Sequence, residues 1–334
     1  MPTRLTLLLL SVLLIAPARA ADGPRLEDVR YPYPPQIFRF QSQQQELEMA
    51  YMDVPAKGAD RRGTVVLFHG KNFSGAYWRE TAAALSERGF RVLIPDQIGF
   101  GKSSKPEHYQ FSFHQLAANT HALLEKVKAG RVHLVGHSMG GMVATRYALM
   151  FPADVLTLTL ANPIGLEDWK AKGVPYQSLD AALAEQFTLT TDKLRAYERK
   201  HYYGGDWRPD YDEWVELIGH FLRSPDYPRM AWNQALTSDM LYTQPVVYEF
   251  PQLKMPVLLI IGQRDRTAPG ADRAPANIRD SLGNYPELGR AAARAIPQAK
   301  LVELDGLGHL PHIEDFPRFI APLQDFLSAH SAAN

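Results

Sequence analysis

The sequence predicts an α/β fold, in which a mostly parallel, doubly wound sheet carries helices on both faces and a helical segment is inserted between two strands. Short, β-branched apolar runs alternate with helical stretches between residues 64 and 160. This order is typical of parallel strands joined by helical crossovers. The alternation stops at Asn162-Pro163 and resumes at residue 256, after a long stretch of helical character without a convincing core strand.

The first twenty residues have the pattern of a secretory signal peptide. Arg4 precedes an apolar run over residues 5–16, and Ala18 and Ala20 provide the small residues of a signal-peptidase site. An uncleaved membrane anchor is the alternative, but this run is shorter than the roughly 20 residues that span a bilayer. We therefore predict that residues 1–20 are removed and that the protein is exported, to the periplasm or beyond, without a stable membrane anchor.

The predicted elements follow one another between recognisable start and stop signals. Residues 21–35 are rich in proline and charge and predict an extended N-terminal arm. Gly89 ends the first helix, and Pro152 follows the third. Strands are expected at 45–54, 64–68, 91–95, 132–135, 155–160, 256–261 and 300–304. Helices are expected at 76–88, 113–128, 139–150, 285–295 and 316–329. The core therefore comprises residues 36–162 and 251–334, and the insertion comprises residues 163–250.

Composition excludes several classes of protein. The 334 residues contain no cysteine, which excludes disulfides, zinc-thiolate sites, iron–sulfur clusters and a cysteine nucleophile. Lys and Arg number 36, as do Asp and Glu, and this balance argues against a nucleic-acid binder, which needs surplus positive charge. The expected partner is a small-molecule substrate.

A candidate nucleophile lies in the segment Gly136-His137-Ser138-Met139-Gly140, between a predicted strand and a predicted helix. In that context Gly-x-Ser-x-Gly indicates a sharp strand-to-helix turn that exposes the serine hydroxyl. Small flanking residues are needed because the turn crowds the backbone. The helix N-terminus also favours negative charge that develops at the site. These features predict Ser138 as a nucleophile, whereas a chance match is the alternative.

Two later segments make the sequence resemble the α/β-hydrolase family, whose catalytic residues follow the chain order Ser, acid, His. The segment 262–265 ends in Asp265 after one strand, and the segment 306–312 contains His309 after the next. The resemblance implies an α/β-hydrolase fold with Asp265 as the acid and His309 as the base. Other candidates stay open, namely Asp168 and Asp305 for the acid and His312 for the base. A metal site at His309 and His312 is not expected, because a third ligand is missing nearby.

The loop after the strand 64–68 is similar to the family's oxyanion loop. It begins His69-Gly70-Lys71, and the resemblance implies oxyanion donors at the backbone N–H groups of Lys71 and Met139. His69 is then structural, and Asp96 organises the next loop. The Lys71 side chain is either solvated or functional.

The insertion falls where this family places a helical cap over its active site. It holds 15 of the 35 aromatic residues. Aromatic side chains can line a pocket for apolar substrate, although a small helical domain also needs them for its own core. Four aromatic residues are the candidate substrate contacts: Phe73, Trp169, Tyr203 and Trp207.

The resemblance implies a serine hydrolase that cleaves a carboxylic ester through an acyl-enzyme, without a metal or cofactor. The balanced charge and the aromatic residues of the insertion favour a small neutral or apolar substrate. The same triad serves C–C bond hydrolases, lactonases, amidases and perhydrolases, so these remain alternatives. A non-catalytic ligand-binding protein is a further alternative.

Overall fold

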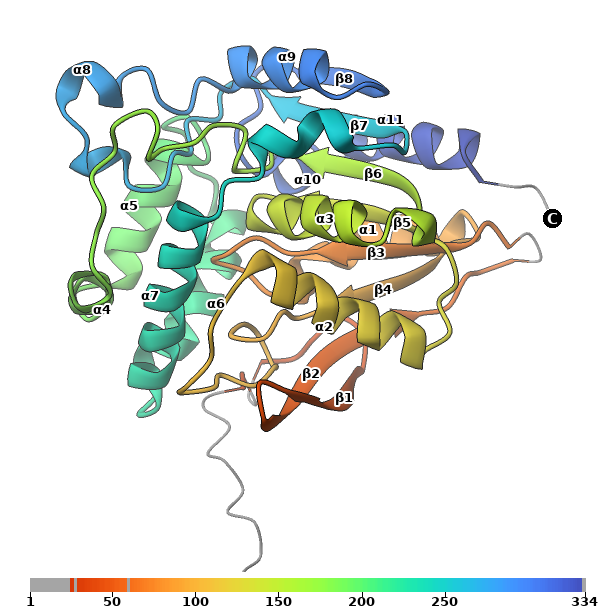
Figure 1. The fold of residues 1–334 in the computed structure, drawn as a ribbon, viewed down its shortest axis with the longest axis horizontal. Helices are drawn as coiled ribbons and strands as arrows, with labels where there is room; N and C mark the ends of the chain where they lie inside the picture. The colour runs from red at the N-terminus through yellow and green to blue at the C-terminus, as the bar shows by residue number, and fades with distance from the viewer. Residues whose placement is uncertain (1–24, 27–28, 59–60, 332–334) are drawn as a thin grey trace, which may run out of the picture.

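The computed structural model describes residues 25–26, 29–58 and 61–331, so the predicted signal peptide lies outside the described residues. Among these residues, eight strands form one sheet in the order β1-β2-β4-β3-β5-β6-β7-β8 (Figure 1). Strands β1 (Pro35–Ser42) and β2 (Gln45–Val54) run antiparallel to their neighbours. The remaining strands are parallel, which confirms the predicted sheet.

The central strands are buried because helices cover both faces of the sheet. In β3 and β7 every residue is buried, which explains why their sequences are continuous apolar runs rather than alternating ones. The parallel strands are β3 (Thr64–Phe68), β4 (Arg91–Pro95), β5 (Val132–His137), β6 (Val155–Ala161), β7 (Val257–Gly262) and β8 (Ala299–Leu304).

Two hydrophobic cores form, one on each face of the sheet. The first lies under α2 (Phe113–Lys126), α3 (Met139–Met150) and α9 (Tyr285–Ala295). The second lies under α1 (Arg79–Glu87) and α11 (Phe316–Ala329). The short helix α8 (Ala276–Arg279) lies between β7 and α9, and α10 (Pro311–Glu314) lies between β8 and α11. The predicted doubly wound arrangement is therefore confirmed.

The segment between β6 and β7 forms a helical layer of its own. Its α-helices are α4 (Leu179–Gln186), α5 (Thr191–His201), α6 (Asp212–Arg223) and α7 (Tyr227–Thr243). Helix α4 packs on α7 and α5 packs on α6. These helices lie together beyond one end of the sheet, on the left of Figure 1. The loops that follow β3, β5 and β6 open toward this layer, so we call residues 163–250 the cap.

The described part of the N-terminal arm is fixed to the core rather than resting on its surface. The Tyr31 hydroxyl is buried and donates to Oδ2 of Asp96 at 2.6 Å. Asp96 also accepts the backbone N–H groups of Gly75 and Lys102, each at 2.7 Å. Asp96 thus organises the loop after β4, as expected.

Strand β1 was not predicted. It pairs along its length with β2, but seven of its eight residues are exposed or half-exposed, a pattern that carries little apolar signal. The turn joining the two strands uses Gln43 and Gln44 at φ of 50° and 61°. Turns of this backbone conformation usually contain Gly or Asn, so the sequence lacks the ordinary hairpin signal.

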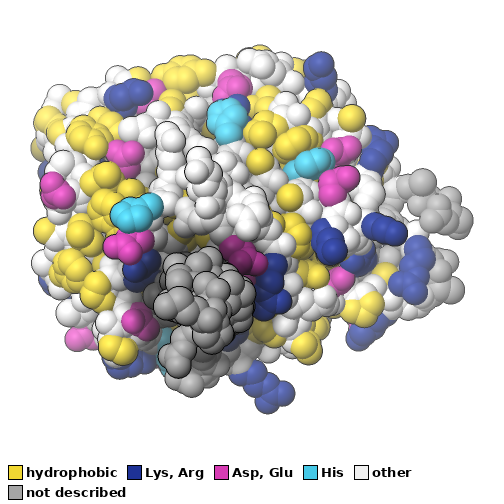
Figure 2. Space-filling model, turned by 60° about the horizontal axis from the view of Figure 1, so that its bottom comes forward, with side chains coloured by type: hydrophobic (Ala, Val, Ile, Leu, Met, Phe, Trp, Pro, Cys, Tyr) yellow, Lys and Arg dark blue, Asp and Glu magenta, His cyan; other side chains and the backbone are white. Residues whose placement is uncertain are grey.

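The surface carries charges of both signs. On the face shown in Figure 2, acidic and basic side chains lie interspersed with apolar ones. Within the part of the chain that the structure describes, no helix is both long enough and apolar enough to span a bilayer.

Candidate active site

Ser138 occupies the turn between β5 and α3, as the sequence predicts. Its backbone has φ of 55° and ψ of −123°, a conformation that is strained for a residue with a side chain. The turn brings α3 against β3 so closely that a Cβ at Gly140 would lie 2.3 Å from the carbonyl oxygen of Phe68. Glycine is therefore required at position 140, and the serine side chain is left to face a cavity.

Asp265 and His309 form a buried pair at the ends of β7 and β8. Nδ1 of His309 lies 2.7 Å from Oδ2 of Asp265, and both side chains are 0% exposed. Since the carboxylate only accepts, Nδ1 donates the proton and Nε2 is left as an acceptor. Nε2 is buried and bonds to none of the described residues. In its neutral form, the imidazole held in this way has a free acceptor nitrogen.

Asp265 is held in place by donors from two further segments. Its Oδ1 accepts the backbone N–H of Thr267 at 2.8 Å, and its Oδ2 accepts from Nδ2 of Asn162, also at 2.8 Å. Asn162 in turn accepts the backbone N–H of Gly262 at 3.0 Å. These donors fix the orientation of the carboxylate toward His309. In the sequence, Asn162 marks only the point where the strand–helix alternation ends, so its supporting role was missed.

The alternative acids lie elsewhere. Asp168 accepts the backbone N–H of Ala171 at 3.1 Å and the hydroxyl of Tyr248 at 2.9 Å. Asp305 is exposed. Of the three candidate acids, the structure brings only Asp265 to His309.

His312, the alternative base, is buried among aromatic rings. Its imidazole stacks on Trp78 with ring centroids 4.6 Å apart and meets the edge of Tyr77 at 4.8 Å. Burial, together with the nearby His309, lowers the pKa of His312 to about 3. Its ring nitrogens bond to none of the described residues, so His312 packs rather than accepting a proton. Among the described residues, no group of three or more His, Asp or Glu side chains is placed to hold a metal ion.

A hydrogen-bond chain joins the nucleophile turn to the histidine loop. Nε2 of His137 donates to the carbonyl oxygen of His309 at 2.8 Å, and Nδ1 of His137 accepts from the Tyr77 hydroxyl at 2.9 Å. The same hydroxyl accepts the backbone N–H of Gly70 at 2.9 Å. Burial, with added repulsion from neighbouring histidines, lowers the pKa of His137 well below its usual value. A neutral His137 therefore ties three loops together, although no local sequence pattern singles out this residue.

The two predicted oxyanion donors lie on either side of Ser138. Lys71 lies in the loop after β3, and Met139 is the first residue of α3. A Cβ built on Gly70 would lie 3.1 Å from Cβ of Ser138, so the loop runs directly against the nucleophile turn. Neither the Lys71 nor the Met139 backbone N–H donates to another described residue. Both groups are therefore available to a substrate oxygen.

His69 holds the same loop from behind. Its Nε2 accepts the backbone N–H of Gln97 at 3.0 Å, and its Nδ1 lies 2.8 Å from the carbonyl oxygen of Gly70. Both ring nitrogens are used inside the protein, which fits the structural role expected for His69.

Ser138 opens into a cavity of about 290 Å³ between the core and the cap. Trp169 lines this cavity, as predicted. Core residues that line it include Lys71, Asn72 and Thr267, and the first part of the cap contributes Ile164 and Trp169. Cap residues that line it include Gln177, Glu185, Tyr197, Tyr202, Asp239 and Tyr242.

The other three aromatic candidates do not line the cavity, so this part of the prediction is corrected. Phe73 stacks on Tyr77 with ring centroids 4.9 Å apart. Tyr203 stacks on Tyr211 at 3.8 Å, and Trp207 meets Tyr203 edge-on at 5.5 Å. These rings build hydrophobic core, which is the alternative use expected for aromatic residues in a small helical layer.

Tyr202, in the cap, contacts both the loop after β3 and the histidine loop. Its carbonyl oxygen accepts the backbone N–H of His309 at 2.7 Å, and its hydroxyl accepts from Nδ2 of Asn72 at 3.1 Å. Its ring lies against the His309 imidazole with centroids 4.6 Å apart. Tyr202 follows the last residue of α5, where one step along the chain decides whether a side chain faces the cavity or the cap interior. The sequence predicts Tyr203 as the substrate contact, whereas the neighbouring residue Tyr202 lines the cavity.

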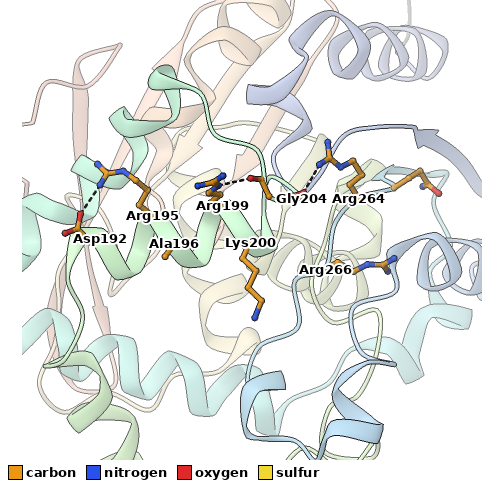
Figure 3. A pocket seen from close by; sticks show the side chains of 10 residues that line it. Asp192, Arg195, Ala196, Arg199, Lys200, Gly204, Arg264 and Arg266 are labelled. Atoms are coloured by element: carbon orange, nitrogen blue, oxygen red, sulfur yellow. Dashed lines mark hydrogen bonds and ion pairs between the residues drawn. The ribbon is translucent and has the colours of Figure 1, made fainter.

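A larger hollow, of about 790 Å³, lies on the outside of the protein and contains none of the predicted site residues (Figure 3). Arg264 pairs with Asp206 at 2.8 Å, and Arg199 donates to the carbonyl oxygen of Gly205 at 2.7 Å. Several of its basic side chains are thus engaged by the turn after α5. The candidate site is the smaller cavity.

Glu198, on α5, provides a test of the cap packing. Its carboxyl group is 0% exposed, has no hydrogen-bond partner among the described residues, and has its pKa raised by burial to about 8. The folded state therefore keeps a proton that the unfolded chain loses near pH 4.5, and stability falls as pH rises from about 4.5 to about 8.

We expect Glu198→Gln to remove this loss. The variant should gain stability over the wild type by up to about 1.4 kcal/mol for each pH unit in that window. Urea unfolding at pH 5 and pH 8 measures the difference, with Glu125→Gln, exposed on α2, as the matched control. Equal pH dependence in wild type and Glu198→Gln would contradict the burial of an unpartnered carboxyl group.

Comparison with known proteins agrees with the fold described above. The family model described as alpha/beta hydrolase fold matches residues 63–198. A crystal structure of a probable hydrolytic enzyme from Pseudomonas aeruginosa is 51% identical, with a TM-score of 0.89 over 91% of this chain and 97% of that one.

Two further relatives are less similar in sequence. Lipase 1 of Psychrobacter immobilis is 27% identical over 75% of this chain and 72% of its own length. The 2-hydroxy-6-oxo-2,4-heptadienoate hydrolase of Pseudomonas putida is 26% identical over 79% of this chain and 89% of its own length.

Proposed function

Because this chain belongs to the α/β-hydrolase family, we propose that it is a serine hydrolase that cleaves a carboxylic ester of a small substrate through an acyl-enzyme intermediate. Ser138 is the nucleophile, His309 the general base and Asp265 the acid that orients the base. The observation that carries this proposal is the buried His309–Asp265 hydrogen bond of 2.7 Å, which leaves Nε2 as an acceptor. Ser138 faces the cavity in a strained turn that holds its hydroxyl outward.

In the first half of the reaction, Nε2 of His309 removes the hydroxyl proton of Ser138 as Oγ attacks the ester carbonyl carbon. The carbonyl oxygen becomes an oxyanion, which the N–H groups of Lys71 and Met139 stabilise. The intermediate collapses when the bond to the alcohol oxygen breaks, and protonated His309 gives its proton to that oxygen. The alcohol leaves, and the acyl group remains on Ser138.

In the second half, water replaces the alcohol. His309 removes a proton from the water as its oxygen attacks the acyl carbon, and the same donors stabilise the second oxyanion. Return of the proton from His309 to Oγ releases the carboxylic acid. The Asp265 carboxylate stabilises the imidazolium in both halves.

The charged lining of the cavity bears on the substrate. The expectation of a neutral or apolar substrate came from the balanced charge and the aromatic residues of the insertion. Lys71, Glu185, Asp239, Asp272 and Arg273 all line the cavity. We therefore propose a small substrate with polar groups.

Hydrolysis of methyl and p-nitrophenyl esters of graded acyl length, measured beside matched lactones and amides, tests this function. We expect kcat/KM to be highest for one of the short esters. Turnover confined to lactones, amides or C–C bonds would replace ester hydrolysis with another reaction of the same triad. Failure of every compound would favour a ligand-binding protein.

We also propose that the protein is exported, on the basis of the pattern in residues 1–20. N-terminal sequencing of protein recovered outside the cytoplasm should then begin at Ala21. Recovery of mature protein that begins at Met1 would overturn this proposal.

A further inference from the structure

The Lys71 side chain projects from the oxyanion loop into the same cavity as Ser138. Its ammonium group donates to Oε1 of Gln234, on α7, at 2.5 Å. Gln234 is buried, so this contact places a positive charge inside the space between core and cap. The position is not that of a surface lysine, whose charged group ordinarily stays in water.

No carboxylate of the described residues forms an ion pair with Lys71. An enclosed ammonium group that has only a neutral amide as partner loses hydration without gaining an opposite charge. Burial accordingly lowers the pKa of Lys71 to about 8, while the more distant Glu185 acts in the opposite direction. A bound anion would supply the missing charge.

The other charges around the cavity come from the cap and from the loop before α8. Glu185 and Asp272 are exposed, so water screens them, and Arg273 adjoins Asp272. Glu185 is bonded by Gln177 at 2.7 Å, and Asp239 accepts from the Tyr176 hydroxyl at 3.0 Å. Among the cavity-lining residues from the loops after β3, β5 and β6, Lys71 is the charged one. It is half-buried, as is Asp239, whereas Glu185, Asp272 and Arg273 are exposed.

We propose that the Lys71 ammonium group binds a carboxylate on the acyl part of the substrate, so that the enzyme prefers half-esters of short dicarboxylic acids. This inference rests on the proposed ester hydrolysis. The oxyanion donor and this charge belong to one residue, so a substrate whose carbonyl oxygen lies at the Lys71 N–H extends its acyl chain beside the Lys71 side chain. Lys71 is thus a specificity-determining residue.

A matched pair of substrates isolates the charge. Monomethyl glutarate and methyl pentanoate have acyl chains of equal length and differ in the terminal carboxylate. In the wild type we expect kcat/KM to favour monomethyl glutarate. Lys71→Met should lower the ratio of the two kcat/KM values by about 10- to 100-fold, the range for a hydrogen bond between charged groups. Lys200→Met, an exposed lysine on α5, is the control and should leave the ratio unchanged.

A binding measurement separates this inference from the proposed function. Calorimetric titration of Ser138→Ala with monomethyl glutarate requires no turnover. Affinity should exceed that for methyl pentanoate and should fall as pH rises from 7 to 9, because Lys71 loses its proton. Adding Lys71→Met should remove both the preference and this decline.

The outcomes are distinct. Preferential, Lys71-dependent binding without hydrolysis of either ester would retain the anion site and overturn the proposed function. Hydrolysis of methyl pentanoate with equal binding of the two esters, before and after Lys71→Met, would overturn the inference and retain the function.

Discussion

Replacement of Ser138 by alanine is expected to lower kcat for ester hydrolysis by about 10⁴- to 10⁶-fold. The variant keeps the cavity, the His309–Asp265 pair and the oxyanion donors, so any residual rate reports binding and polarisation without covalent catalysis. Alanine and serine are equally strained in this turn, so the substitution adds no backbone strain and should affect the fold little. KM should change far less than kcat, since the hydroxyl contributes little to ground-state binding.

Stopped or continuous assays on a neutral methyl ester measure this loss. Ser281→Ala is the matched control, because Ser281 is exposed and donates only to the carbonyl oxygen of Ile278, at 2.7 Å. Its kcat should equal that of the wild type. A Ser138→Ala enzyme that retains more than a tenth of the wild-type kcat would remove Ser138 from the chemistry.

Asp265→Asn is expected to lower kcat by about 10³- to 10⁴-fold, because it places the proton of the neutral His309 ring on the wrong nitrogen, Nε2 instead of Nδ1. The side-chain position nearest Thr267 must accept a backbone N–H, so the amide oxygen belongs there. The amide NH₂ then faces Nδ1 of His309, where Asp265 now accepts. Nδ1 must become the acceptor and Nε2 the donor, which leaves no base for Ser138.

Two other carboxylates serve as matched controls for this prediction. Asp168→Asn and Asp305→Asn should retain kcat within about threefold, since neither carboxylate bonds to His309 or Asp265, and Asp305 is exposed. Thermal unfolding of all three variants separates catalytic loss from instability. If Asp168→Asn or Asp305→Asn lost activity and Asp265→Asn did not, the acid role would move to that residue.

The core could be predicted from the sequence because its signals are local. Continuous apolar runs bounded by Gly or Pro give β3, β5 and β7, and the predicted bounds of β3 agree with those observed. Ser138 could be singled out for the same reason, since its strand, turn and helix are adjacent in the chain. Strand β1 could not be predicted in this way, because its position depends on pairing with the long strand β2 and not on an apolar pattern of its own.

The surroundings of the site were less accessible because they depend on distant segments meeting. Asn162 bonds to Asp265, which lies 103 positions further along the chain, and His137 bonds to His309 across 172 positions. No local pattern marks such partners. Tyr202 and Tyr203 are equivalent in the sequence, yet only Tyr202 faces His309, because the end of α5 sets their directions.

For Lys71, the resemblance predicted the role of the backbone N–H but not the surroundings of the side chain. Its backbone position follows from the loop after β3, whereas its enclosure depends on Gln234, on a cap helix far along the chain. The balanced composition of the whole chain therefore gave no indication of the unpaired charge inside the cavity.

Covalent labelling with an alkyl fluorophosphonate tests the assignment of Ser138 most directly, because the reagent reacts far faster with an activated serine than with an ordinary hydroxyl group. Mass spectrometry of the wild type should find one phosphonyl group per chain, on the peptide containing Ser138, and labelling of Asp265→Asn should be much slower. Ser138→Ala should remain unmodified under the same conditions. An adduct on another residue, or an equal yield in Ser138→Ala, would contradict Ser138 as the nucleophile.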